Sequence, residues 1–223
     1  MIDEKLENTE QEDIEDLLLK VESSFGISLA ENELAHIKTF GQFCDYIADK
    51  IQLDNLKDCT TQQAFYKLRS AIATTSHLDK KKVTPNLELT ELLPRKNRKT
   101  LVQNLETELD FRLDLLSPPD WIVSTLFIML LCSFVGLFIK WQLGVLGITF
   151  SICGFWVSAK FGNELTLQTL GQIAEKMTRD NYLKSRRNSN TFNKSEIEKV
   201  LTDLFTIELA LDKSLLTRNS TFP

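Results

Sequence analysis

Outside the middle of the chain, apolar residues recur at helical spacing. Two sets follow the i, i+3, i+4, i+7 pattern of a single helix face. They are Ile14, Leu17, Leu18, Val21 and Phe25, and Phe40, Phe43, Cys44, Ile47 and Ile51. Shorter stripes of the same period lie within 65–72, 101–109, 170–177 and 197–205. Because no stretch alternates as a β-strand would, we predict an all-α protein of amphipathic helices.

Three hydroxyl residues have the spacing of a capping box. In this motif a Ser or Thr before the helix, and a Glu or Gln three residues later, satisfy free main-chain amides at the helix start. The pairs are Thr39 with Gln42, Thr60 with Gln63, and Ser195 with Glu198. We therefore expect helices to begin directly after these three hydroxyl residues.

The middle of the chain holds two uncharged runs. Residues 121–139 are 19 residues without a formal charge, about 28 Å as a helix at ~1.5 Å per residue, which is close to the hydrocarbon thickness of a bilayer. After Lys140-Trp141-Gln142, residues 143–159 form a second run of 17 residues. These runs predict a transmembrane helical hairpin over 121–159. The alternatives are a hairpin buried in a soluble core, and one span followed by a re-entrant arm.

Charged residues suggest an orientation and a location. Basic side chains precede the first run and follow the second, whereas Lys140 alone lies at the tip. The flanking residues are Arg95, Lys96, Arg98, Lys99, Arg112, Lys160, Lys176 and Arg179. Lys and Arg residues that flank membrane spans are enriched on the cytoplasmic side. We therefore expect both termini to be cytoplasmic in a multi-pass protein of the bacterial inner membrane.

The N-terminal part of the chain is strongly acidic. Residues 1–58 carry 5 basic and 15 acidic side chains, whereas 59–120 carry 10 and 8. An acidic surface repels nucleic acid and anionic lipid and suits a basic protein partner. We therefore expect no nucleic-acid partner.

Two long-range similarities indicate an internal repeat. Asn32-Glu33-Leu34 followed by 39–44 resembles Asn163-Glu164-Leu165 followed by 169–174, with one residue fewer between the halves. Residues 78–89 align without gaps on 211–222, with five identities in twelve. Each of these two segments follows an amphipathic helix, so the same helix-plus-loop element occurs twice.

The order of the repeated elements predicts how the chain folds. Both parts of one copy lie in the middle of the chain, and the hairpin is inserted into it. The two parts of the other copy lie at opposite ends of the chain and could complete each other. We expect the termini to meet. The first unit would be 12–58 with 193–223, the second 59–120 with 161–188, and the hairpin 121–159. Exchange of the terminal halves between two chains would instead give a homodimer.

Both copies resemble acyl carrier proteins, small helical bundles that hold acyl chains on a phosphopantetheine arm. The N-terminal copy resembles the family from the end of its second helix through its last helix. The matching residues are Phe25-Gly26-Ile27-Ser28-Leu29, Glu31, Glu33, Ala35, Ile37, Thr39 and Asp45-Tyr46-Ile47. The central copy is similar over Val83-Thr84-Pro85-Asn86, Leu92-Leu93 and Leu105-Glu106-Thr107-Glu108-Leu109. The resemblance implies two acyl-carrier-like helical bundles.

The residue that carries the arm in this family is missing. Family members attach phosphopantetheine to the serine of Asp-Ser-Leu at the start of the second helix. Here the equivalent positions hold Gln11 and Arg95, in Glu10-Gln11-Glu12 and in the stretch 95–99. Since the ester needs a hydroxyl, the resemblance implies that neither copy binds this cofactor. An arm attached out of register, for example on Ser214, is the alternative.

No residue pattern in the chain predicts catalysis. The two histidines, His36 and His77, are far apart in sequence, and no Cys or His spacing suits a metal. The four cysteines are expected to be reduced. Asp110, Asp114 and Asp120 could form a carboxylate site beside the membrane or simply cap a helix end. We therefore expect no enzymatic activity, no cofactor and no metal.

Two basic clusters are candidates for contacts with lipid phosphates or with an acidic protein. They comprise Lys80, Lys81, Lys82, Arg95, Lys96, Arg98 and Lys99. The expected function is a non-catalytic, membrane-anchored, acyl-carrier-like docking or recruitment module. Its partners would be the lipid bilayer and a protein of acyl or lipid metabolism. The alternative is a lipid-handling protein or enzyme that uses these clusters beside the bilayer.

Overall fold

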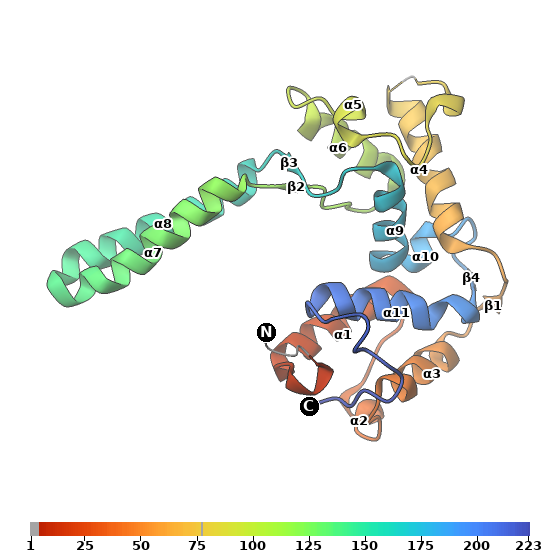
Figure 1. The fold of residues 1–223 in the computed structure, drawn as a ribbon. Coiled ribbons are helices and arrows are strands. Elements are labelled where there is room, and N and C mark those ends of the chain that lie inside the picture. Colours follow the sequence, from red (N-terminus) through yellow and green to blue (C-terminus); the bar gives the residue numbers. More distant parts are fainter. Residues whose placement is uncertain (1–4, 77) are drawn as a thin grey trace. The chain divides into compact units, whose positions relative to one another are not determined.

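The computed structural model describes residues 5–76 and 78–223, and these residues are mostly helical (Figure 1). The all-α prediction is confirmed at this level. The chain forms two compact units. The first contains the residues up to Pro85 together with Leu170–Pro223, and the second contains Asn86–Thr169. The expected second bundle is divided between them, because 59–85 and 170–188 lie in the first unit.

The first unit is built from both ends of the chain. Its elements are η1 (Leu6–Asn8), α1 (Gln11–Phe25), α2 (Glu31–Leu34), α3 (Phe40–Lys50), β1 (Asp54–Asn55), α4 (Thr60–Ser76), η2 (Lys80–Lys82), α9 (Leu170–Asp180), α10 (Tyr182–Ser185), β4 (Thr191–Phe192) and α11 (Lys194–Glu208). The second unit contains α5 (Leu89–Leu92), α6 (Arg98–Leu109), β2 (Leu116–Ser117), α7 (Asp120–Ile139), α8 (Trp141–Phe161) and β3 (Glu164–Leu165).

Aromatic residues from the two chain ends form the centre of the first core. The ring of Phe205 in α11 lies 5.0 Å from that of Phe40 and 5.6 Å from that of Phe43, both in α3. Near the C-terminus, Phe222 places its ring 5.9 Å from Phe43. Helix α11 also packs against α1 and α9. The prediction that the ends of the chain meet is confirmed.

Two pairs of helices repeat one burial pattern. Helices α3 and α9 both have 11 residues, and α4 pairs with α9 as α11 pairs with α3. Buried residues occupy five equivalent positions in α3 and α9, and four in α4 and α11, as expected where the same apolar stripe packs in both copies. In α4 and α11 the matching residues are Ala64 with Ile197, Leu68 with Leu201, Ala71 with Leu204, and Ile72 with Phe205.

Main-chain contacts at the starts of α3 and α9 are also repeated. The amide of Gly41 donates to the carbonyl of Arg218 over 2.9 Å, and the amide of Gly171 donates to the carbonyl of Pro85 over 2.8 Å. In the alignment of 78–89 with 211–222, Pro85 corresponds to Arg218. A side chain at either glycine would lie close to that carbonyl, which explains the small residue at both places.

An isolated antiparallel bridge precedes each of these helices. Thr39 pairs with Thr221, and Thr169 pairs with Glu88, the residue aligned with Thr221. The flanking hydrogen bonds are equivalent too. They run from the Phe222 amide to the Lys38 carbonyl (3.2 Å) and from the Leu89 amide to the Gln168 carbonyl (2.8 Å). These matching contacts are those expected of an internal repeat.

Helices α1 and α6 end in the same way. Each is followed by a left-handed residue, Gly26 with φ 60° and Asp110 with φ 61°. In each, a glutamate in the last turn accepts a hydrogen bond from the main-chain amide seven residues on. The pairs are Glu22 with Leu29 and Glu106 with Leu113. Asp110 therefore caps a helix end, as one of the two interpretations of this residue predicts.

The predicted hairpin corresponds to α7 and α8. The structure contains two helices long and apolar enough to cross a membrane, and only 6% and 17% of their most apolar windows are buried. Their apolar side chains therefore face outward, which argues against the alternative of a hairpin in a soluble core. Glycines on α8 allow close packing, since a Cβ at Gly147 would lie 2.1 Å from the Ser133 hydroxyl and one at Gly154 2.6 Å from Leu126.

The capping-box prediction is right once and wrong twice. Thr39 and Gln42 form the motif before α3. Thr60 instead is the first residue of α4, and its amide and hydroxyl donate to the Glu196 carboxylate. Ser195 lies inside α11, which Asn193 caps by accepting from the Ser195 amide. Spacing along the chain does not reveal a cap that comes from a distant residue.

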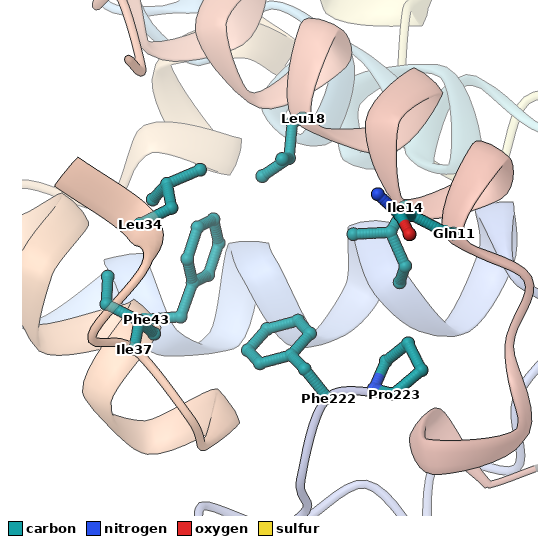
Figure 2. Close-up of a pocket in the computed structure, with 8 residues that line it drawn as sticks. All are labelled: Gln11, Ile14, Leu18, Leu34, Ile37, Phe43, Phe222 and Pro223. Atoms are coloured by element: carbon teal, nitrogen blue, oxygen red, sulfur yellow. The ribbon is translucent and has the colours of Figure 1, made fainter. Parts of the chain in front are cut away.

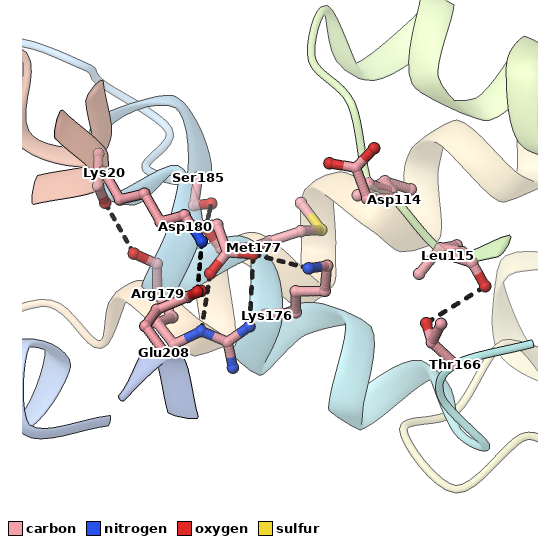
Figure 3. A network of polar contacts seen from close by, with 12 residues as sticks. Lys20, Asp114, Leu115, Thr166, Lys176, Met177, Arg179, Asp180, Ser185 and Glu208 are labelled. Atoms are coloured by element: carbon pink, nitrogen blue, oxygen red, sulfur yellow. Dashed lines mark hydrogen bonds and ion pairs between the residues drawn. The ribbon is translucent and has the colours of Figure 1, made fainter. Parts of the chain in front are cut away.

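Short strands also depart from the all-helical expectation. Two-residue strands β1 and β4 pair in parallel, and β2 and β3 pair antiparallel. Beside the latter pair, the Thr166 amide donates to the Leu115 carbonyl over 3.0 Å, a contact to which the Thr166 hydroxyl adds (Figure 3). Glu164-Leu165 is thus a strand, whereas its repeat partner Glu33-Leu34 is helical. Two residues are too few to carry a strand periodicity.

Candidate functional site

An apolar cavity lies in the first unit between α1, the α2–α3 segment and the C-terminus (Figure 2). Its volume is about 230 Å³. The lining side chains are Gln11, Ile14, Leu18, Leu34, Ile37, Phe43, Phe222 and Pro223. Gln11 is the only polar residue among these eight. The cavity therefore suits an apolar group, and its lining supplies no nucleophile and no general acid or base.

Gln11, which the resemblance to acyl carrier proteins would align with the attachment serine, is the first residue of α1. Its side chain is exposed and donates a hydrogen bond to the Glu15 carboxylate over 3.1 Å. An amide does not form the phosphoester that a hydroxyl would. The other equivalent position, Arg95 in the second unit, is exposed and forms an ion pair of 2.5 Å with Glu164.

The outer face of α1 carries the acidic charge of the N-terminal part. Glu12, Asp13, Glu15 and Asp16 are all exposed on this helix. Next to them lies Leu19, whose relative exposure of 63% is high for a leucine. An acidic helix face with one exposed apolar residue suits a basic protein surface with an apolar contact.

Polar contacts hold α1, α9 and α11 in place (Figure 3). Lys20 of α1 forms an ion pair with Glu208 of α11. At the end of α9, Asp180 accepts from Lys176 over 2.8 Å and from Arg179 over 2.7 Å. The Lys20–Glu208 pair joins α1 to α11, whereas the two pairs of Asp180 lie within α9. We assign all three a structural role.

The candidate basic clusters lie in different units. Lys80, Lys81 and Lys82 form η2 in the first unit and are exposed, and Lys80 donates to the Ser70 hydroxyl over 3.3 Å. Residues 95–99 belong to the second unit. Arg98 is only 7% exposed, and its guanidinium donates to the carbonyls of Leu93 and Asn163. Burial therefore removes Arg98 from the residues that we propose as lipid or partner contacts.

A buried polar network was missed by the sequence analysis. Arg186 is 1% exposed, and its guanidinium donates to the Thr60 hydroxyl over 2.6 Å and to Thr191 over 3.1 Å. Thr60 in turn donates to Glu196, which also accepts from the buried Tyr182 hydroxyl over 3.4 Å. The network connects the starts of α4 and α11, the two repeated helices. Burial of Arg186 has no local signal, since it lies in a basic, polar stretch.

The thiols differ in their surroundings. All four cysteines are free, as expected. Burial raises the pKa of the Cys44 thiol to about 12, so it is a packing residue rather than a nucleophile. Cys59 is exposed just before α4.

The remaining candidate residues do not form a catalytic cluster. His36 is exposed and places its ring 6.5 Å from that of Tyr46, and His77 lies outside the described residues. Asp114 is exposed with φ 47°, and Asp120 begins α7. Within 5–76 and 78–223, no group of three His, Cys, Asp or Glu side chains is arranged to hold a metal ion.

Comparison of the chain with models of known protein families, with curated proteins and with solved structures found no match.

Proposed function

We propose that this protein is a non-catalytic, membrane-anchored docking module built from two acyl-carrier-like helical repeats. The observation that carries the proposal is a contrast between packing and chemistry. The repeat keeps its buried positions and main-chain contacts in both copies. The two positions that the resemblance aligns with the attachment serine are occupied by Gln11 and Arg95. A helical surface is thus retained where carrier chemistry is lost.

The surface most suited to docking is the exposed face of α1. Its four carboxylates and Leu19 offer charge and one apolar contact to a basic partner. In acyl carrier proteins the corresponding helix follows the attachment serine. A protein of acyl or lipid metabolism with a basic surface is therefore the proposed partner.

Membrane anchoring is the second part of the proposal. Helices α7 and α8 have 20 and 21 residues, and their most apolar 18-residue windows have mean hydropathy of 2.6 and 1.5. Basic residues concentrate at the end of the hairpin where both helices join the rest of the chain. By the positive-inside rule, this end and both termini belong on the cytoplasmic side of a bacterial inner membrane.

Recovery of partners from native membranes tests the docking role. The full chain, tagged at one terminus and extracted in mild detergent, should recover a protein of acyl or lipid metabolism. The variant Asp13→Lys/Asp16→Lys should lose that protein, because charge reversal repels a basic surface. A matched control, Glu91→Lys/Glu108→Lys, reverses two exposed carboxylates of the second unit and should retain it. Equal recovery by both variants would contradict docking through α1.

Mass spectrometry tests the loss of carrier chemistry. The purified chain is incubated with coenzyme A and a phosphopantetheinyl transferase, beside an active carrier protein as positive control. We expect no added mass on this chain. An adduct on Ser214 or another serine would support the alternative of a working carrier and contradict the proposal.

A further inference from the structure

A second cavity lies at the base of the membrane hairpin, entirely within the second unit. Its volume is about 490 Å³. Its walls come from α6, the segment that leads to β2, and the end of α8. The lining residues are Lys99, Val102, Gln103, Glu106, Arg112, Asp114, Leu115, Leu116, Ala159, Lys160 and Gly162. Three cationic side chains therefore surround a space next to the membrane-spanning segment.

The side chain of Lys99 reaches the main chain of Lys160. The Lys99 ammonium lies 3.4 Å from the carbonyl oxygen of Lys160 and 5.1 Å from the centre of the Phe161 ring. The Lys160 ammonium lies 5.2 Å from the centre of the Trp156 ring. Contacts with ring faces orient the ammonium groups without neutralising their charge. Both lysines therefore remain available for an anion.

The two carboxylates of the lining, Glu106 and Asp114, offset only part of this positive charge. The Glu106 carboxylate accepts hydrogen bonds from the main-chain amides of Leu113 and Asp114, over 2.7 and 3.4 Å. The same use of a glutamate recurs at Glu22 in the other copy. With Arg112 exposed beside the lysines, cations outnumber acidic residues in the lining.

The position of the cavity along the hairpin matches the headgroup layer. Trp121 begins the apolar part of α7 and is 71% exposed, as an interfacial anchor would be. Gly162, directly after α8, lies against Ser117 and Pro118, with a Cβ there only 2.6 Å from their main chain. Lys160 thus lies at the level where the hairpin leaves the bilayer, which is where lipid phosphates are found.

We infer that this cavity binds the phosphate of an anionic phospholipid headgroup, with Lys99 and Lys160 as its principal contacts and Arg112 beside them. The acyl chains would lie along the exposed apolar face of α7 and α8. The inference rests on the proposed insertion of the hairpin in a membrane, and it adds a lipid specificity to that role.

The experiment uses the full chain in detergent, mixed with phosphatidylcholine and phosphatidylglycerol and examined by native mass spectrometry. The protein should retain phosphatidylglycerol in preference to phosphatidylcholine. The variant Lys99→Gln/Lys160→Gln should lose that preference by about tenfold or more, since each lysine near an anionic lipid surface contributes about 1 kcal/mol. The single variant Lys199→Gln removes an exposed cation of α11 in the first unit, outside both basic clusters, and should bind as the wild type does.

Two further measurements separate the possible outcomes. Excess inorganic phosphate should leave phosphatidylglycerol bound, because the acyl chains contribute to retention. Displacement by phosphate would show a site for free phosphate and overturn the inference. Equal lipid binding by the wild type and the double variant would also overturn it. Failure of the protein to incorporate into vesicles of either lipid would instead contradict membrane anchoring, and incorporation by the variants controls for folding.

Discussion

The amide nitrogen of Gly41 lies 2.9 Å from the carbonyl oxygen of Arg218, which joins the first turn of α3 to a segment near the C-terminus. The same contact joins Gly171 to Pro85 at the start of α9. The two ends of the chain thus form one copy of the repeat together. The other copy lies in the middle of the chain and is interrupted only by the hairpin. This relationship explains why both ends of the chain belong to one compact unit.

The two glycines should respond differently to alanine. A Cβ at Gly41 would lie 2.8 Å from the Arg218 carbonyl oxygen, whereas one at Gly171 would lie 3.3 Å from that of Pro85. Alanine gains up to about 1 kcal/mol of helix propensity at either place, but overpacking costs about 1–3 kcal/mol. We expect Gly41→Ala to lower the free energy of unfolding by about 1–2 kcal/mol relative to Gly171→Ala. Denaturant unfolding of both variants in detergent, followed by circular dichroism, measures this difference.

The buried network at the start of α4 should be sensitive to loss of Glu196. Its carboxylate accepts from the amide and hydroxyl of Thr60 and thereby replaces a local cap. Glu196→Ala should cost about 1–3 kcal/mol of unfolding free energy, because these donors lose their acceptor. Glu196→Gln keeps one acceptor oxygen and should cost less. Equal losses in the two variants would argue against the capping role.

Thiol labelling should distinguish Cys44 from Cys59. The pKa of Cys44 lies at about 12 because the side chain is buried, so in the folded state it is protonated and shielded. We expect iodoacetamide at neutral pH to modify Cys59 in the first unit and to spare Cys44 until denaturant is added. Peptide mass spectrometry of the protein before and after unfolding provides the measurement. Rapid modification of native Cys44 would contradict its place in the core.

Acid should weaken the contact between α2 and α3. The pKa of Glu33 lies at about 2, below its ordinary value of 4.5, because the Lys50 ammonium, the Ala30 amide and the Tyr46 hydroxyl donate to it. A lowered carboxyl pKa stabilises the folded state above pH 4.5, and this contribution disappears as pH falls toward about 2. Thermal unfolding of wild type and Glu33→Gln across this range should therefore converge at the acid end. A difference that is constant with pH would contradict the assignment.

Much of the architecture is encoded in local patterns. Apolar spacing predicted α1, α3, α9 and α11, because a helix face needs only residues that are near in sequence. The uncharged runs predicted α7 and α8 for the same reason. The alignment of 78–89 with 211–222 predicted which segments would occupy equivalent places. Each of these features depends on residues within one contiguous stretch of chain.

Other features depend on residues that are distant in sequence. Thr60 is capped by Glu196, and Arg98 is buried under carbonyls of Leu93 and Asn163, although local spacing suggested a different role for each. The cavity at the hairpin base likewise requires Lys99 and Lys160 to be brought together.

Local patterns in the chain thus predicted the long helices, the hairpin and the repeated segments. Tertiary structure decided which side chains are buried, capped or gathered around a cavity. The physical reason is that periodicity reports the faces of single elements, whereas burial and hydrogen bonding of a side chain depend on the elements that pack against it.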